Sequence, residues 1–168
     1  MRQTFKACFN ISFICYVLAL IMQLFIGVMF VGMRGHALAD VPLVEYLRSS
    51  PNFVPFRTIR TYAVSIVDED LSTSIAIKNL LGNVILFLPM GIYLPYYIKN
   101  IKSTGRFTLS MIALLFLVEV IQLVTQRGSF DIDDFILNIV GAFLGYGFWN
   151  SKVVQKMLVP QAAARQSL

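Results

Sequence analysis

The stretch that decides the fold runs from Ile11 to Met33 and reads ISFICYVLALIMQLFIGVMFVGM. It contains 23 consecutive residues and no charged side chain. A helix rises about 1.5 Å per residue, so this length is enough to cross a hydrocarbon core of about 30 Å. The stretch therefore predicts a transmembrane helix.

Three further apolar runs follow, at residues 80–98, 107–124 and 132–149. The last reaches spanning length only if it begins near Ile132, which places Asp133 and Asp134 at its entry. The whole chain of 168 residues is 57% hydrophobic and 14% charged, which is too apolar for an ordinary soluble domain. We expect an all-α, polytopic membrane bundle of about four transmembrane helices. It forms a single domain, residues 1–168, with a long outer loop after the first helix.

The charged residues predict the orientation of this bundle. All nine carboxylates lie in two alternate inter-helix regions or in the helix that leads to one of them. The other short segments carry eight basic residues and no acid: Arg2, Lys6, Lys99, Lys102, Arg106, Lys152, Lys156 and Arg165. Cytoplasmic loops are enriched in Lys and Arg, so both termini are expected in the cytoplasm.

Other classes fit the sequence less well. Residues 1–40 resemble a signal peptide with a cleavage site at Ala37–Ala39, but the apolar stretch exceeds the usual 7 to 15 residues, which favours an uncleaved anchor. The formal net charge is +5, yet the basic residues are split among short flanks, which argues against nucleic acid as a partner. Cys8 and Cys15 give neither a disulfide framework nor a metal-binding spacing.

Polar residues inside the apolar runs point to a candidate site. Glu119 lies well within the third run, where a carboxyl group must be paired, hydrogen-bonded or protonated, and Gln122 follows one turn later. In the fourth run one helical stripe contains Asp134, Asn138, Gly141 and Gly145. Asn79 and Asn83 lie at i and i+4 in the second span and form a third stripe. The three polar stripes predict one shared pocket at the outer ends of three helices.

Structural roles explain part of this pattern equally well. Acids at the start of a helix cap free N–H groups and complement the helix dipole, and this reading applies above all to Asp133. Glu119 can be a packing group bonded to Asn83 or Asn138, and Arg127 can extend to the interface. Gly141 and Gly145 form a GxxxG pattern, which allows close helix packing but is common in membrane helices.

An ordered set of motifs between about residues 52 and 145 resembles the VanZ-like family of bacterial membrane proteins. The motifs are NFVPF at 52–56, NVILFLPMG at 83–91, EVIQ at 119–122, Arg127 with DIDD at 131–134, and NIVG at 138–141. The family is named after an accessory factor of glycopeptide (teicoplanin) resistance. The resemblance implies a multi-pass protein of the bacterial cytoplasmic membrane and leaves a link with resistance as one interpretation.

The resemblance implies action on lipid head groups or lipid-linked cell-envelope precursors. The residues that match the family pattern are Asn83, Glu119, Gln122, Arg127, Asp131, Asp134 and Asn138. We assign Glu119, Asp131 and Asp134 as candidate catalytic residues. Arg57, Asn83, Gln122, Arg127 and Asn138 are the candidate substrate-binding residues, since guanidinium groups hold phosphates well.

Whether the protein is an enzyme stays open at this stage. The alternative is a non-catalytic protein that binds envelope components, a drug or a partner protein at the outer leaflet. A transporter or channel is less consistent, because four spans leave little room for a path unless the chain forms a homo-oligomer. Two carboxylates alone are a weak metal signal, so no metal site is predicted, and the sequence identifies no cofactor.

Overall fold

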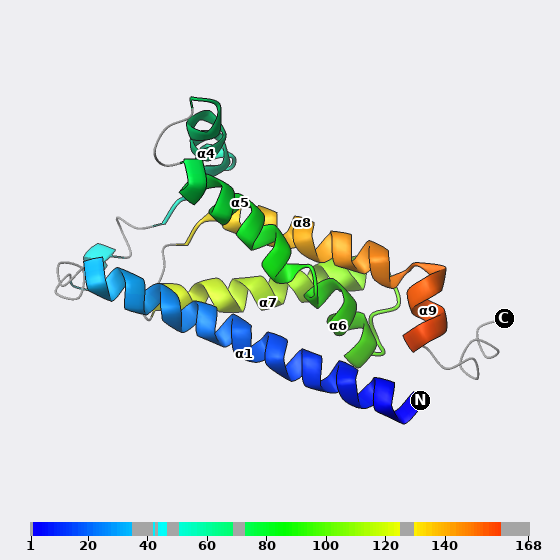
Figure 1. Cartoon of the computed structure of the whole chain (residues 1–168). Coiled ribbons are helices and arrows are strands. Elements are labelled where there is room, and N and C mark those ends of the chain that lie inside the picture. Colours follow the sequence, from blue (N-terminus) through cyan, green and yellow to red (C-terminus); the bar gives the residue numbers. More distant parts are fainter. Residues whose placement is uncertain are drawn as a thin grey trace. The chain divides into compact units, whose positions relative to one another are not determined.

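The computed structural model describes residues 2–34, 42, 44–46, 51–68, 73–124 and 130–158. These residues are mainly helical, and one isolated parallel bridge joins Asn52 to Asp131. Figure 1 labels the helices α1 (Arg2–Arg34), α4 (Arg57–Val67), α5 (Thr73–Phe87), α6 (Met90–Tyr97), α7 (Thr104–Val124), α8 (Ile132–Trp149) and α9 (Lys152–Leu158).

Four helical segments are long and apolar enough to cross a membrane. They are Gln3–Gln23, Thr73–Tyr97, Thr104–Val124 and Ile132–Trp149. Each contains at least 18 residues, which is about the length needed to span the hydrocarbon core. The prediction of an all-α, multi-pass membrane protein with about four spanning helices is confirmed. Its assignment as one domain stays a prediction.

The second spanning segment is a pair of helices, α5 and α6, because Pro89 interrupts it. A proline has no N–H group to continue the helical hydrogen bonds, and its ring clashes with the preceding turn. The chain turns at Leu88 and Pro89, where the N–H of Gly91 donates to the carbonyl of Leu88 at 3.1 Å. Helix α6 then contains a second, buried proline, Pro95. The apolar run predicted at residues 80–98 is therefore divided between two helices.

The described residues divide into two compact units. One unit is formed by Met1–Val54 with Leu114–Ile132, and the other by Pro55–Ala113 with Asp133–Leu168. In the first unit, the aliphatic side chains of Ile11, Ile14 and Leu18 on α1 are exposed, as expected for a helix that faces lipid. The rings of Phe53 and Phe130 lie 5.1 Å apart beside the Asn52–Asp131 bridge.

In the second unit, three glycines allow helix α8 to pack closely on α5 and α6. A Cβ atom at Gly141 would overlap the carbonyl oxygen of Val84, and one at Gly145 would overlap that of Leu88. A Cβ atom at Gly91 would overlap the backbone of α8 at Ala142. The predicted small-residue seam is confirmed, and its partner is the second spanning segment. The backbones of α8 and of the second spanning segment approach so closely at these glycines that no side chain fits between them.

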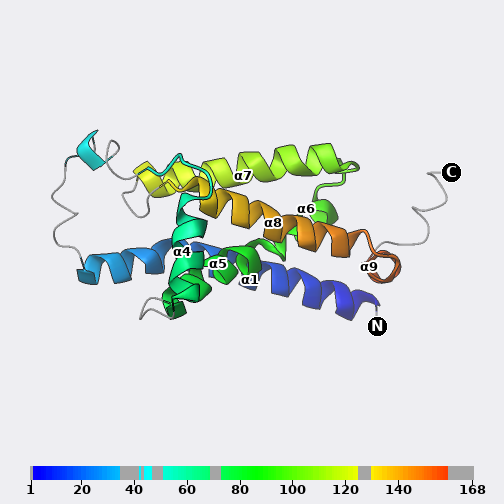
Figure 2. The ribbon, with the colours of Figure 1, turned by 90° about the horizontal axis from the view of Figure 1, so that it is seen from above.

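Helix α4 was not predicted as a helix. Figure 2 shows that it runs across the direction of α8. None of its described residues is buried, and it contacts α5 through a hydrogen bond from Asn79 to the Tyr62 hydroxyl at 2.9 Å. This direction suits a helix that lies along a membrane surface.

Candidate functional site

Asp133 is the most completely buried carboxylate among the described residues, with an exposed fraction of 0%. Its two oxygens accept hydrogen bonds from three backbone N–H groups at the start of α4: Phe56 at 2.5 Å, Thr58 at 2.7 Å and Ile59 at 3.1 Å. The first N–H groups of a helix have no partner within the helix, and an anion there is favourable. Asp133 therefore caps α4 from the first turn of α8.

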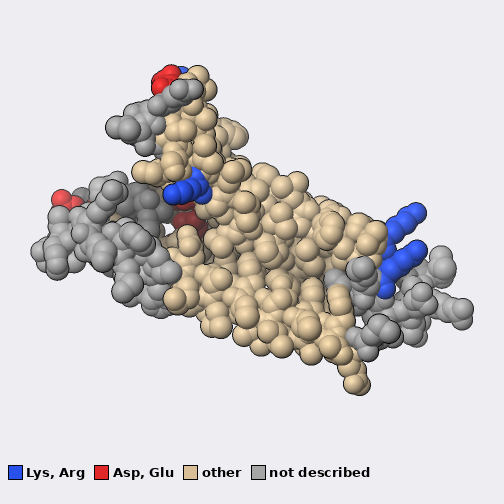
Figure 3. All heavy atoms as spheres, viewed as in Figure 1, with Lys and Arg blue, Asp and Glu red and all other residues tan. Residues whose placement is uncertain are grey.

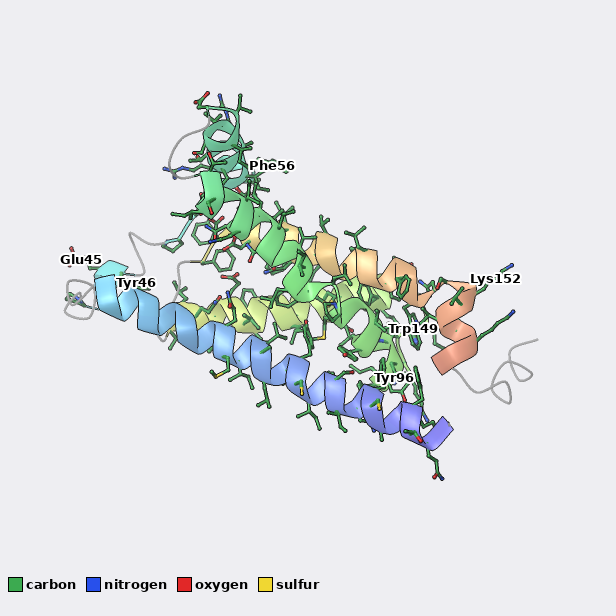
Figure 4. All side chains as sticks on the ribbon, in the orientation of Figure 1. Glu45, Tyr46, Phe56, Tyr96, Trp149 and Lys152 are labelled. Carbon is green, nitrogen blue, oxygen red and sulfur yellow. The ribbon has the colours of Figure 1, made fainter. Side chains whose placement is uncertain are left out.

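The backbone at Phe56 is shaped for this contact. Phe56 precedes α4 and has φ 64° and ψ 8°, the left-handed conformation that a bulky residue rarely adopts. Its own side chain makes no capping hydrogen bond. Such a conformation costs on the order of 1 to 3 kcal/mol, and hydrogen bonds to a charged acceptor offset a cost of that size. Figure 4 labels Phe56 at this junction.

Asp134, the next residue, faces α5. Its carboxylate accepts a hydrogen bond from the Asn83 side-chain amide at 2.5 Å. Both residues are half-buried, and both lie on helices long and apolar enough to span a membrane. The structure thus brings together two of the predicted site residues, one from the second span and one from the fourth.

Asn138 lies one turn further along α8, between Asp134 and Gly141 on the same stripe. Its side chain is buried, with an exposed fraction of 7%. The oxygen Oδ1 accepts no hydrogen bond from the part of the chain that the structure describes. A buried acceptor left without a donor costs about 1 to 3 kcal/mol. The buried Oδ1 therefore lowers stability, and this makes Asn138 a candidate for binding a ligand.

Arg57 lies at the same end of α8 because Asp133 fixes the start of α4 there. Its two chain neighbours, Phe56 and Thr58, each donate a backbone N–H to the Asp133 carboxylate. Its side chain is exposed. Asp133 and Asp134 thus have separate partners: one holds the backbone around Arg57, and the other binds Asn83. We call Asn83, Asp134, Asn138 and Arg57 the polar cluster.

The other candidate residues belong to the first unit. Glu119 is buried, with an exposed fraction of 4%, and Gln122 is half-buried. Asp131 accepts a hydrogen bond from the Asn52 side-chain amide at 3.1 Å, and two backbone hydrogen bonds reinforce the bridge between these segments. The burial predicted for Glu119 is confirmed. The hypothesis that Glu119 and Gln122 share one pocket with the polar cluster stays a prediction.

A family model described as VanZ/LLP1 matches residues 13–155. The chain belongs to the VanZ/LLP1 family. Protein VanZ of Enterococcus faecium is 37% identical to it over 84 residues, which is 48% of this chain and 52% of that protein. The chain thus aligns with about half the length of this relative. No solved structure is significantly similar to the chain.

The VanZ/LLP1 family assignment and the four candidate spans establish a multi-pass membrane protein. Arg127, which matches the family pattern in the sequence, lies outside the described residues. No three His, Cys, Asp or Glu side chains of the described chain gather in a group that could hold a metal ion. The described residues of the polar cluster offer amide, guanidinium and carboxylate groups, which suit a polar organic or phosphate-containing ligand.

Sequence reasoning missed two residues of this VanZ/LLP1 protein. Asp133 was interpreted as a cap of its own helix, whereas it caps α4, and Asn52 was noted only as part of a motif. One signal was present in the sequence. The segment before Arg57 reads NFVPF, so no Ser, Thr, Asp or Asn stands immediately before α4 to cap it. A helix without a local cap needs an acceptor from elsewhere in the chain.

Proposed function

We propose that this VanZ/LLP1 family member binds head groups of lipids or of lipid-linked envelope precursors at the outer leaflet, through the polar cluster. The observation that carries the proposal is the buried Oδ1 of Asn138, which lacks a donor among the described residues. Hydroxyl and amine groups of a head group are donors that can satisfy it. Binding would then recover the hydrogen bond that the free protein lacks.

Arg57 supplies the second part of the recognition. Its guanidinium group presents donors in a planar fork that matches two phosphate oxygens. The N-terminus of α4 itself is occupied by the Asp133 carboxylate, so the charge offered to a phosphate is that of the exposed Arg57 side chain. A head group with a phosphate and a hydrogen-bond donor fits both parts.

We also propose roles for the other candidate residues, which are those of the first unit and Arg127. Glu119 is the general acid or base, and Asp131 and Asp134 orient the reacting group. Gln122 and Arg127 contribute to substrate binding. A carboxyl group held away from water is suited to proton transfer when it lies within reach of the substrate.

Lipids that co-purify with the protein test the binding proposal. The full chain is extracted in mild detergent, and its bound lipids are identified by mass spectrometry. We expect one head-group class to be enriched with the wild type and lost with Asp134→Asn. The matched control is Asp68→Asn, because Asp68 is an exposed acid at the other end of α4. Identical lipid profiles for wild type and Asp134→Asn would refute the proposal.

Variants of Glu119 separate an enzyme from a binding protein. The lipid identified above is supplied to purified protein, and both bound lipid and chemically altered product are measured. If Glu119 transfers a proton, Glu119→Gln retains bound lipid but forms no product. A wild-type protein that binds the lipid and never alters it is a non-catalytic binding protein.

We also propose that both termini face the cytoplasm of a bacterial cell, in its cytoplasmic membrane. The test replaces Cys8 and Cys15, which are both exposed in the structure, and introduces single cysteines elsewhere. An impermeant thiol reagent applied to intact cells should label Arg60→Cys on α4 and should not label Lys102→Cys. Labelling of Lys102→Cys from outside would reverse the orientation.

A link with glycopeptide resistance is a second candidate function. It is favoured by the 37% identity to Protein VanZ of Enterococcus faecium, although that alignment covers only 52% of that protein. Expression in a teicoplanin-sensitive bacterium should raise the teicoplanin concentration needed to stop growth, and Asp134→Asn should not. Equal susceptibility with and without the wild-type protein would exclude this function.

A further inference from the structure

Five exposed basic side chains surround the end of α8 that leads into α9. They are Lys99, Lys102, Arg106, Lys152 and Lys156, which we call the basic ledge. The described residues 91–113 and 135–158 contain no Asp or Glu, so nothing within these segments neutralises the ledge. Figure 3 shows Lys and Arg side chains gathered at the end that carries α9.

Aromatic contacts hold the two parts of the ledge at one end of the same unit. The Tyr96 ring meets the Trp149 ring edge-on with centroids 6.2 Å apart, which places the end of α6 beside the end of α8. The Phe107 ring stacks on Tyr146 at 4.1 Å and places the start of α7 there too. Lys99, Lys102 and Arg106 lie on the chain between these two contacts.

Hydrogen bonds hold the segments that carry the ledge. The Arg106 guanidinium donates to the carbonyl of Asn100 at 3.1 Å, within the loop before α7. Gln155 of α9 donates its side-chain amide to the carbonyl of Trp149 at 2.9 Å. Val154 is buried, whereas Lys152 and Lys156, one helical turn apart, are exposed. Figure 4 shows Lys152 pointing away from the helices.

The surface beside the ledge is apolar and aromatic. Trp149 is 9% exposed, and the nearby side chains of Ile98, Phe148 and Val153 are exposed. Tyr and Trp are enriched where a spanning helix leaves the hydrocarbon core. A basic surface that continues directly into exposed apolar side chains matches a phosphate group attached to acyl chains. An acidic peptide or a nucleic acid would use the charges but leave this apolar border without a partner.

We propose that the basic ledge is a binding site for anionic phospholipids in the leaflet that meets the α9 end of the protein. It is separate from the polar cluster, which lies at the opposite end of α8, and does not depend on the function proposed for that cluster. Each Lys or Arg close to an anionic membrane surface strengthens binding about fivefold. A five-residue ledge should therefore select anionic over zwitterionic lipids clearly.

The position of Trp149 gives a direct measurement. It is the only tryptophan of the chain, so its fluorescence reports on lipids at the ledge. The full chain is placed in phosphatidylcholine vesicles with increasing fractions of brominated phosphatidylglycerol, whose bromine atoms quench nearby tryptophan. A parallel series uses brominated phosphatidylcholine. We expect phosphatidylglycerol to quench at a several-fold lower fraction, and the difference to shrink in about 1 M salt, where screening acts within about 3 Å.

Variants identify the residues responsible. Lys152→Gln combined with Lys156→Gln should reduce the preference at least fivefold, and the corresponding Arg pair should retain it. The matched control is Lys78→Gln, an exposed lysine near the start of α5, which should change nothing. Equal quenching by both lipids, an unchanged preference in the Gln pair, or an equal loss in Lys78→Gln would overturn the proposal. The proposal would also be overturned if inorganic phosphate or an acidic peptide displaced phosphatidylglycerol from the basic ledge.

Discussion

The two halves of α8 are held against the second spanning segment, α5 and α6, by different kinds of contact. Towards α9, helix α8 packs on α5 and α6 through Gly91, Gly141 and Gly145, whose backbones touch without any polar side chain. Towards α4, the same helices meet through the Asn83–Asp134 hydrogen bond. The first half gains packing alone. The second retains a buried acceptor at Asn138 that receives no hydrogen bond from the described residues. The comparison separates backbone packing from polar side-chain pairing along a single helix, α8.

The largest expected effect comes from disrupting the half of α8 that packs through glycines. In Gly141→Leu the new side chain must occupy the position of the Val84 carbonyl oxygen, so the helices must separate along the seam. We expect a loss of about 3 kcal/mol or more, or no folded protein. Thermal unfolding in detergent measures it.

The matched control for this change is Gly147→Leu, because a Cβ atom at Gly147 meets nothing within 4 Å. It should unfold close to the wild-type temperature. If both variants unfold at the same temperature as the wild type, close packing does not stabilise this half and the comparison fails.

The second largest effect concerns Asp133, which stabilises the start of α4 and precedes Asp134 of the polar cluster. Asp133→Asn replaces a carboxylate that accepts three backbone hydrogen bonds with an amide that can supply only one acceptor oxygen. We expect a loss of about 2 kcal/mol, since hydrogen bonds to charged groups contribute about 1.5 to 3 kcal/mol. Hydrogen exchange at Phe56, Thr58 and Ile59 should accelerate.

Asp68→Asn is the control, because Asp68 is an exposed acid at the other end of α4. It removes a negative charge from a helix C-terminus and should leave exchange at the N-terminus unchanged. Equal exchange rates in Asp133→Asn and wild type would show that α4 does not need the cap.

The smallest expected change in stability is at Asn138, and it tests most directly whether this residue serves binding or structure. Asn138→Leu keeps a branched side chain and removes the buried acceptor that lacks a donor among the described residues. We expect stability to stay constant or rise by about 1 kcal/mol, while co-purifying lipid is lost. A large fall in unfolding temperature with bound lipid retained would assign Asn138 to structure and remove it from the site.

The features that depend on single residues or short spacings could be predicted from the sequence. Apolar length predicted the four spans, and the spacing of Gly141 and Gly145 predicted a seam. The seam's partner could not be predicted, because the complementary surface is the backbone of Val84 and Leu88, which has no sequence signature. The break at Pro89 was likewise missed, although its physical cause was visible in the sequence.

The roles of neighbouring acids were harder to predict for a physical reason. An acid at a helix start can bind N–H groups of its own helix or of another, and both uses need the same residue type. Only the fold shows that Asp133 binds α4 whereas Asp134 binds Asn83. The single shared pocket expected from three polar stripes stays a prediction, since one stripe lies in the other unit.

The capping of α4 by Asp133 also dictates an order of assembly during synthesis. The acceptor lies 77 residues after the Phe56 N–H group that donates to it. Because the ribosome makes the chain from its N-terminus, α4 must leave the ribosome and wait for the fourth span before its first turn has a partner. Truncation of the chain before Asp133 should therefore leave the first turn of α4 open, even though every residue of α4 is present.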